Sequence, residues 1–222
     1  EEDIARYRGQ YRLGWDQLRL RRHRRQLEMG IVDKRWPLSP RDPQAPAWDA
    51  VGDKAAWDLK MAVYAAQIDR MDQGIGRILR AIRETGGEQN TLLLFLSDNG
   101  GCSVHVDRGK KGVPPGPADS FLSYDLPWAN ASNTPFRLYK SNIHEGGIAT
   151  PLIARWPARI KRTGGLIHEP GHVMDILPTC LEAAGAPYPT TYQKRPVLPA
   201  EGRSLLPLLE GGRREPHPSI GW

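Results

Sequence analysis

One short segment of the chain combines a carboxylate, a carboxamide and two glycines: residues 97–101, Ser-Asp-Asn-Gly-Gly. It directly follows the apolar run 91–96, which predicts a strand. Because ligands in open α/β sheets bind beyond the carboxyl ends of the strands, a site is expected here. Asp98 and Asn99 offer the hard oxygen ligands that calcium or magnesium prefers. The alternative is an ordinary Asx turn, and the pair is too small to complete a metal site unaided.

A second group of candidates surrounds Lys140, which precedes Glu145-Gly146-Gly147 by five residues. The compact point charge of lysine suits a sulfate or phosphate group. His144 and Glu145 are placed to orient neighbouring groups. The alternatives are a solvated surface charge for the lysine and a structural role for the histidine.

Two further residues are weaker candidates. His105 lies in the long loop after Asp98, where it is a possible ligand contact. Asp175 is expected to cap a helix that begins near Ile176, which places Pro178 in the tolerated first turn. His172, three residues before Asp175, is expected to be structural.

The elements that must position these residues are predicted from periodicity. Residues 1–29 read as helical, with interruptions at Gly9 and Gly14, and residues 30–55 carry four prolines and read as a connector. Residues 56–85 show apolar side chains at spacings of three and four, which predicts a helix of about eight turns. Gly86-Gly87 is expected to end it, and the helix is long enough to cross a sheet.

The rest of the chain completes an α/β pattern. Because the run 91–96 has no polar face, it is expected to be an inner strand covered on both sides. Residues 97–139 are expected to be irregular but ordered, since five aromatic residues anchor them. A shorter, peripheral strand is predicted at 151–157, and a helix at 173–184 that ends at Gly185. Residues 186–222 are rich in proline.

Composition excludes several classes of protein. The chain has 222 residues, a formal net charge of +6 and 39% hydrophobic residues, which is typical of a soluble globular chain and not of a disordered one. No run approaches the length of a membrane span, and the acidic first residues show no signal peptide. Cys102 and Cys180 lack the spacing of a zinc cluster, and a single bridge between them is left open.

The positive charge is concentrated in one segment. Six arginines stand between residues 12 and 25 with only Asp16 opposing them. Such a cluster can bind an anionic polymer. The favoured interpretation is a solvated helix face that turns Tyr11, Trp15, Leu18 and Leu27 inward, because no aromatic platform interleaves the arginines.

Four segments together carry a resemblance to a known family. They are residues 91–101, residues 140–151 (Lys-Ser-Asn-Ile-His-Glu-Gly-Gly-Ile-Ala-Thr-Pro), residues 154–157 (Ala-Arg-Trp-Pro) and residues 172–179. In order and spacing the series resembles the arylsulfatases, type I sulfatases of the alkaline phosphatase superfamily. The stretch 62–78 is similar to the helix that precedes the metal-binding strand in that family.

The resemblance implies a fold and a set of roles. The fold would be α/β, part of an alkaline-phosphatase-like mixed sheet flanked by helices and truncated at both ends. Residues 1–222 would be the middle-to-C-terminal part of the catalytic domain, with a helical and proline-rich first segment (1–55), an α/β core (56–185) and a proline-rich tail (186–222). Asp98 and Asn99 would hold calcium, or alternatively magnesium. Lys140 would contact the sulfate, with His144 as a second substrate contact.

The sequence departs from the family at two places. The Cys/Ser-x-Pro-x-Arg motif, whose first residue becomes the formylglycine nucleophile, is missing, and so are the paired aspartates that complete the metal site. The resemblance therefore implies a piece of a sulfatase that needs the remaining N-terminal part and is inactive alone. Its substrate would be a sulfate ester, and its location periplasmic or secreted; no nucleic-acid partner is expected. The alternatives are a phosphodiesterase or phosphonate hydrolase of the same superfamily, and a non-catalytic basic module that binds an anionic polymer.

Overall fold

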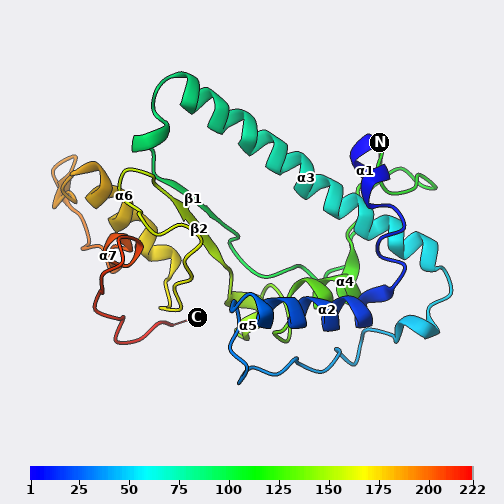
Figure 1. The fold of residues 1–222 in the computed structure, drawn as a ribbon. Helices are drawn as coiled ribbons and strands as arrows, with labels where there is room; N and C mark the ends of the chain where they lie inside the picture. The colour runs from blue at the N-terminus through cyan, green and yellow to red at the C-terminus, as the bar shows by residue number, and fades with distance from the viewer. Residues whose placement is uncertain (222) are drawn as a thin grey trace. The chain divides into compact units, whose positions relative to one another are not determined.

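A computed structural model describes residues 1–221 of the chain. It contains both helices and short strands, in agreement with the predicted combination of helix and sheet (Figure 1). The α-helices are α1 (Glu2–Tyr7), α2 (Gly14–Glu28), α3 (Lys54–Glu84), α4 (Asp125–Ser132), α5 (Glu145–Ile148), α6 (Ile176–Ala184) and α7 (Leu206–Leu209). The strands are β1 (Leu93–Leu96), β2 (Leu152–Arg155), β3 (Thr191–Tyr192) and β4 (Arg195–Pro196), and the 3-10 turns are η1 (Trp48–Ala50), η2 (Glu88–Asn90) and η3 (Val173–Asp175).

The chain divides into two compact units, and each is built from two separate stretches of sequence. Unit 1 comprises Glu1–Ala81 and Asn99–Thr150, and unit 2 comprises Ile82–Asp98 and Pro151–Trp222. The 56–185 segment predicted as a single core therefore contributes to both units.

Tryptophan packing forms the core of unit 1. Trp15 of α2 and Trp128 of α4 are fully buried, with ring centroids 5.2 Å apart in an edge-to-face arrangement. Trp48 of η1 packs edge-to-face on Trp15 at 4.7 Å, so the proline-rich connector contributes to the core. Gly14 allows this approach, because a Cβ there would lie 2.2 Å from the Trp48 ring and because its φ is +83°.

The long helix α3 confirms the prediction made for residues 56–85, and Gly86 follows it at φ +77°. Its first half is buried at Met61, Ala62 and Ala66. Further along the same face Met71 and Ile78 are exposed by 46% and 61%, so the predicted apolar stripe is only partly covered.

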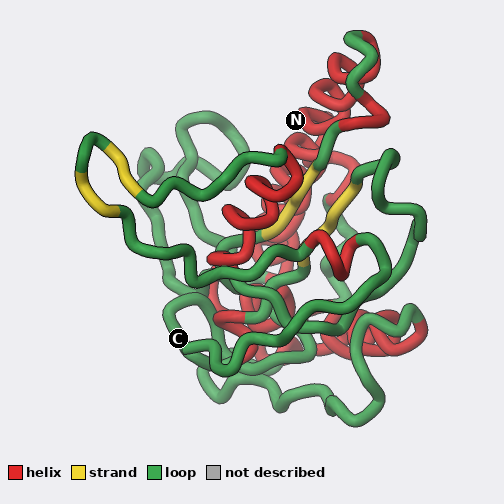
Figure 2. Tube along the Cα trace, turned by 90° about the vertical axis from the view of Figure 1, so that its left-hand side faces the viewer, coloured by secondary structure: helices red, strands yellow, loops and turns green. Residues whose placement is uncertain are grey.

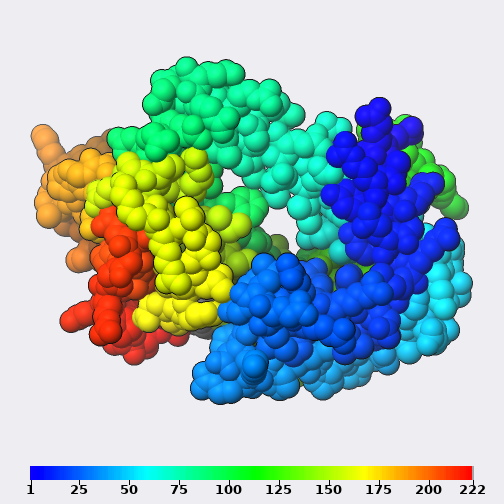
Figure 3. Space-filling view, viewed as in Figure 1, coloured from blue at the N-terminus to red at the C-terminus, as the bar shows by residue number. Residues whose placement is uncertain are grey.

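The N-terminal helix is fastened to α3 by polar contacts. Arg70 pairs with Asp3, and the Gln73 amide donates to the same carboxylate at 3.0 Å. Arg6 pairs with Asp69 at 3.2 Å, and the Tyr7 hydroxyl donates to it at 3.1 Å. In the space-filling view the first residues (dark blue) accordingly lie against α3 (cyan) (Figure 3).

The arginine segment is helical, as the favoured interpretation required, but its arginines do not form one solvated face. Arg19 is only 4% exposed and its guanidinium donates to the Ser39 carbonyl at 2.6 Å. Burial also lowers the pKa of Arg22. Arg19 is therefore withdrawn from any surface that could attract a polyanion, and Arg22 is half-buried.

The prediction that residues 91–96 form an inner strand covered on both sides is wrong for the part of the chain that the structure describes. Strand β1 has one partner there, β2, in an antiparallel ladder that pairs Leu93 with Arg155 and Leu96 with Leu152. Leu94 and Leu96 line an apolar groove of about 480 Å³ with α6. Phe95, which does not line the groove, is 39% exposed, and Leu96 is 37% exposed although it lines the groove.

The helix predicted at 173–184 begins as η3 and continues as α6, with Pro178 in the first turn and Gly185 at φ +63° as its C-cap. The predicted role of Asp175 as the α6 cap needs correction, because its side chain makes no capping bond to α6. It instead accepts from the His172 backbone N–H at 2.9 Å, which closes a capping box on η3.

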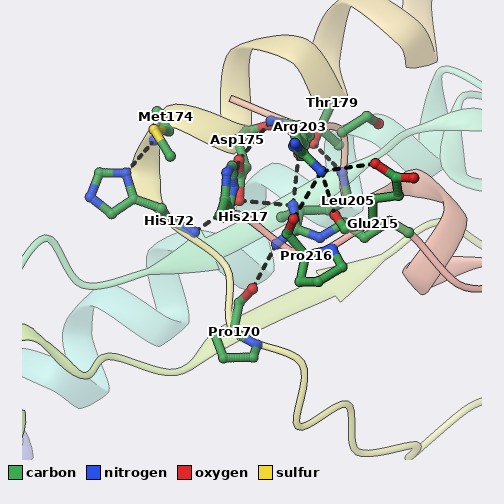
Figure 4. Close-up of polar contacts among 12 residues, drawn as sticks. Pro170, His172, Met174, Asp175, Thr179, Arg203, Leu205, Glu215, Pro216 and His217 are labelled. Atoms are coloured by element: carbon green, nitrogen blue, oxygen red, sulfur yellow. Dashed lines mark hydrogen bonds and ion pairs between the residues drawn. The ribbon is translucent and has the colours of Figure 1, made fainter. Parts of the chain in front are cut away.

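Asp175 is also the centre of a buried polar cluster (Figure 4). Its carboxylate is fully buried and accepts from the Arg203 backbone at 2.8 Å, from Arg214 at 2.9 Å and from His217 Nε2 at 2.7 Å. The side chains of Arg214 and His217 are each only 4% exposed. The cluster ties the proline-rich tail to the start of α6.

The tail contains more structure than its composition indicated. Leu205 and Leu206 are buried at the start of α7. Strands β3 and β4 form a small hairpin that projects as a loop in Figure 2. Its two turn residues, Gln193 and Lys194, both have positive φ, as a two-residue hairpin turn requires.

The long segment 97–139 is ordered by its aromatic residues, as expected, but it contains a helix that the sequence did not indicate. Tyr124, Trp128 and Tyr139 are buried, whereas Phe121 is 60% exposed. Helix α4 lies between the first and last of these anchors. Both cysteines, Cys102 and Cys180, are free thiols.

Candidate functional site

The loop that carries Lys140 lies beside the turn that follows Asp98. We call residues 137–147 the Lys140 loop. The Lys140 backbone N–H donates to the Gly101 carbonyl at 3.1 Å, and the Gly100 N–H donates to the Gly147 carbonyl at 2.9 Å. Two segments distant in sequence are thus joined within unit 1.

Asn133, the residue after α4, holds the same two segments from one side. Its carbonyl oxygen accepts from the Gly101 N–H at 2.8 Å, and its amide nitrogen donates to the Leu138 carbonyl at 2.9 Å. A single carboxamide therefore satisfies one backbone group of each segment, which fixes their separation.

Close backbone packing explains the glycines of the two motifs. A Cβ on Gly100 would lie 1.8 Å from the Gly146 carbonyl oxygen. One on Gly146 would lie 2.3 Å from the Arg137 carbonyl oxygen, and one on Gly147 would lie 2.0 Å from that of Asn142. These glycines are required by close approach and not by an unusual φ. The predicted tight turn at 146–147 is the short helix α5.

The backbone on both sides of Lys140 is strained. Leu138 has φ +65° and Ser141 has φ +73°, a region that costs free energy for residues other than glycine. Such conformations persist where the surroundings over-determine them, and they cluster at ligand sites. The Lys140 side chain is itself exposed, as is His144 at the N-cap of α5. The Lys140 ammonium is thus exposed on a loop whose backbone is constrained on both sides of the lysine.

The two proposed metal ligands are neighbours in sequence that belong to different units. Asp98 ends the first stretch of unit 2 and is exposed, and Asn99 begins the second stretch of unit 1. The Asn99 amide nitrogen donates to the Gly100 carbonyl at 2.8 Å, which turns the amide oxygen away from that carbonyl. The donor chemistry fits a hard divalent cation. In the described residues no three His, Cys, Asp or Glu side chains gather as a metal site, so the two oxygens are at most part of a ligand set.

His105 does not lie at the Lys140 loop. Its Nδ1 is 2.8 Å from Asp125 Oδ1 at the start of α4, and its side chain is 68% exposed. Asp125 and Asn133 are residues that sequence reasoning missed, because a lone aspartate and a lone asparagine in an irregular stretch carry no spacing signal.

We expect Gly100→Ala to destabilise unit 1 by about 1–3 kcal/mol, because the added methyl group collides with backbone that cannot rotate away. Gly76→Ala in α3 is the matched control, since a Cβ there meets nothing within 4 Å. The control should stabilise the helix by about 0.5–1 kcal/mol. Urea unfolding followed by tryptophan fluorescence measures both. Equal stabilities of the two variants would contradict the packing argument.

Comparisons with known proteins place the chain in a family. The sulfatase family profile matches residues 21–186. An uncharacterised sulfatase of Schizosaccharomyces pombe is 35% identical over 230 residues, which cover 96% of this chain and 41% of that protein. The arylsulfatase of Klebsiella aerogenes is 34% identical over 221 residues, which cover 92% of this chain and 47% of the enzyme.

Another relative is human steryl-sulfatase, 37% identical over 150 residues that cover 67% of this chain and 22% of that protein. Among solved structures, a phosphonate monoester hydrolase from Silicibacter pomeroyi aligns with a TM-score of 0.46 and 22% identity, over 79% of this chain and 27% of that one. None of the helices in residues 1–221 combines the length and apolarity of a bilayer-spanning segment.

The chain spans less than half the length of the two sulfatases that it matches over most of its own length. The matched region runs from within α2 to just beyond α6 and includes the whole Lys140 loop and the turn after β1. On this evidence the chain belongs to the sulfatase family of the alkaline phosphatase superfamily.

Proposed function

We propose that this chain is part of an arylsulfatase-like enzyme that hydrolyses sulfate esters with a divalent metal and a formylglycine nucleophile located outside the chain. Membership of the sulfatase family supports the reaction class. The observation that carries the proposal is the Lys140 loop, in which strained backbone and close-packed glycines hold a cation beside the turn after β1.

Lys140 is the residue that binds the sulfate group. An ammonium is a compact charge with three donors, so it neutralises sulfate oxygens and the charge that develops on the bridging oxygen as the ester bond breaks. Because the rigid loop fixes its backbone, little reorganisation is needed at the moment of reaction. His144, four residues on and also exposed, is the second substrate contact.

Asp98 and Asn99 are the proposed ligands of the metal, which is calcium or, alternatively, magnesium. When bound, the cation polarises the oxygens of the sulfate group. Asp98 offers a carboxylate and Asn99 a carboxamide oxygen as ligands. Together they supply only part of the six to eight ligands that calcium takes. The remaining ligands must come from elsewhere in the enzyme.

The sequence has no Cys/Ser-x-Pro-x-Arg motif from which formylglycine is made. We therefore propose that the isolated 222-residue chain has no turnover, and that activity needs the polypeptide that carries the nucleophile. We call the chain joined to that polypeptide the complete enzyme. Its substrate is a sulfate ester, and its location is periplasmic or secreted.

The test is turnover of 4-nitrophenyl sulfate by the complete enzyme, beside phenyl phosphonate and phosphodiester substrates. Faster hydrolysis of the sulfate supports the proposal. A preference for the phosphonate or the diester would move the assignment to the phosphonate hydrolases or phosphodiesterases. Turnover by the isolated chain would contradict the proposed location of the nucleophile.

The proposed metal ligands can be tested separately by calcium titration of the complete enzyme in a calorimeter. We expect Asp98→Asn to weaken calcium binding at least about 10-fold, because it removes a negatively charged ligand. Asp49→Asn is the control, since that carboxylate is fully exposed and is 3.9 Å from Lys54. Unchanged affinity in Asp98→Asn would remove this residue from the metal site. Magnesium, titrated in the same way, distinguishes the two cations.

The polyanion-binding alternative receives no comparable support. Arg19 is buried in contact with the Ser39 carbonyl, so the arginine segment is in part structural. The sulfatase family match also includes most of α2.

A further inference from the structure

The side chain of Asn133, the residue that follows α4, bonds to both segments of the candidate site. Its Oδ1 accepts from the Gly101 N–H at 2.8 Å, and its Nδ2 donates to the Leu138 carbonyl at 2.9 Å. Gly101 lies two residues after Asn99, a proposed metal ligand. Leu138 lies two residues before Lys140, the proposed sulfate ligand. The proposed reaction gives this side chain no contact with the substrate or the metal.

A carboxamide is suited to this pair of bonds. A backbone N–H needs an acceptor and a backbone carbonyl needs a donor, and the amide of Asn133 presents one of each on neighbouring atoms. Aspartate would offer acceptors alone. Because Asn133 is half-buried, water would not fully replace either bond if it were lost. The two bonds therefore fix both the orientation of the amide and the separation of the two backbones.

The backbone of Asn133 is itself held by α4. Its N–H donates to the Ala129 carbonyl at 3.0 Å, and its carbonyl accepts from the Phe136 N–H at 2.8 Å. Helix α4 is anchored in turn by Trp128, which is fully buried in the core of unit 1. Because the core fixes α4, a movement of either bonded segment must stretch a hydrogen bond to Asn133.

The turn after β1 is also packed closely at Gly101. A Cβ on Gly101 would lie 2.3 Å from the Tyr124 hydroxyl oxygen and 3.2 Å from Asn133 Oδ1. Tyr124 is 8% exposed, and its ring stacks on that of Tyr64 at 4.5 Å. The turn therefore cannot approach Tyr124 without a collision, and it cannot move away without breaking the bond to Asn133.

The Lys140 loop closes a ring of three contacts with these residues. The Lys140 backbone N–H donates to the Gly101 carbonyl at 3.1 Å, which joins the loop to the turn directly. The bonds from Asn133 to Gly101 and to Leu138 supply the other two sides. Leu138 has φ +65°, a conformation that persists only where the surroundings over-determine it. The bond from Asn133 is one of the contacts that hold it there.

We propose that Asn133 is a positioning residue that holds the backbone of Lys140, and through it the ammonium, in register with the turn after β1. It acts through Lys140 and touches neither the substrate nor the metal. Misplacing a group at a reacting centre by about 1 Å can cost about 10²-fold in rate, so the position of the lysine matters as well as its charge. The inference rests on the proposed sulfatase function and deepens it.

The bridge is tested in the 222-residue chain by amide hydrogen exchange, followed by NMR. Asn133→Ala removes both bonds, so exchange of the Gly101 amide is expected to quicken at least about 10-fold. Asn133→Asp keeps an acceptor for this N–H but no donor for the Leu138 carbonyl, so protection of Gly101 should stay close to that of the wild type. Equal protection of Gly101 in the wild type and in Asn133→Ala would overturn the inference whatever the activity.

The role is tested in the complete enzyme by a double-mutant cycle on kcat/KM for 4-nitrophenyl sulfate. Asn133→Ala is expected to lower kcat/KM about 10–10²-fold when Lys140 is present. In the Lys140→Ala background the same change should cost less than about 2-fold, because a residue that acts through Lys140 has nothing left to position. A merely structural role would give the same loss in both backgrounds. Asn133→Asp is carried through the same cycle, so the result does not depend on the folding of Asn133→Ala.

Gln26→Ala is the matched control. The Gln26 carboxamide donates to the Thr134 carbonyl at 2.9 Å, one residue beyond Asn133, so the variant removes a similar bond beside the bridge and should leave kcat/KM unchanged. Equal losses in the two backgrounds, or no loss in Asn133→Ala, overturn the inference while the proposed function stands. Full activity of Lys140→Ala, or no turnover of the sulfate by the wild type, overturns both.

Discussion

Replacing Lys140 with alanine in the complete enzyme is expected to lower kcat/KM for an aryl sulfate by about 10²–10³-fold, the usual cost of removing one charge-stabilising donor from a transition state. Because the lysine is proposed to contact both the bound sulfate and the charge that develops later, kcat and KM should both change. Steady-state kinetics with 4-nitrophenyl sulfate measure the effect.

Two variants make this result specific to the Lys140 position. Lys34→Ala removes another exposed lysine of unit 1 and should leave kcat/KM unchanged. Lys140→Arg keeps the charge, but its planar, larger head group does not fit a position set by a rigid loop, so only partial activity is expected. If Lys140→Ala retained full activity, the assignment of the lysine as the sulfate ligand would be wrong.

The second large effect concerns stability. Asp175→Asn is expected to destabilise unit 2 by about 3–5 kcal/mol, because it leaves Arg214 with only 4% of its side chain exposed and no countercharge. The asparagine also replaces one acceptor oxygen with an NH2 group that faces donors, so the loss combines the missing charge with missing hydrogen bonds. Urea-dependent hydrogen exchange of the α6 amides measures it, since those amides belong to unit 2.

Glu210→Gln is the matched control for this variant. It breaks the Arg159–Glu210 pair, also in unit 2, whose side chains are 47% and 32% exposed. Exposed pairs of this kind contribute about 0–1 kcal/mol. Similar losses in the two variants would show that the Asp175 cluster is no more than a surface contact.

The stability of unit 2 is expected to depend on pH because of the same Asp175 cluster. Burial raises the pKa of Asp175, but bonds from the Arg203 and His172 backbone and from Arg214 and His217 hold it below its ordinary value of 3.8. Because the folded state binds this proton less readily than the unfolded chain, the stabilisation is complete above about pH 5. It is lost as the pH falls below 3.8 toward the lower folded-state value. The stability difference between wild type and Asp175→Asn should shrink over that acidic range.

Elements defined by local chemistry were predictable from the sequence. Helix α3 followed from its period of three and four and from Gly86, and strand β2 followed from its bracketing prolines. Helix α4 was not predictable, because its residues Asp-Leu-Pro-Trp-Ala-Asn-Ala-Ser are held by burial of Trp128 and not by an amphipathic pattern. The coverage of β1 was misjudged, since an apolar run does not say what covers it.

For the candidate site too, the sequence indicates some residues but not the contacts that hold them in place. Residue types and the order of motifs select Lys140 and the turn after β1 as candidates, and their roles stay predictions. The contacts that hold them depend on residues distant in sequence, such as Asn133 between Gly101 and Leu138. The same is true of Asp175, whose buried partners Arg214 and His217 follow 39 and 42 residues later.

The discontinuous units have a consequence for synthesis on the ribosome. Unit 1 cannot close until Asn99–Thr150 has been made, and unit 2 begins at Ile82 yet needs residues beyond 200 to neutralise Asp175. Domains usually fold in the order in which they emerge, but here the first stretch of unit 2 must wait while unit 1 is finished. The apolar strand β1 is thus made long before β2 can pair with it, and a nascent chain that pauses between them presents an unpaired edge open to aggregation or chaperone capture.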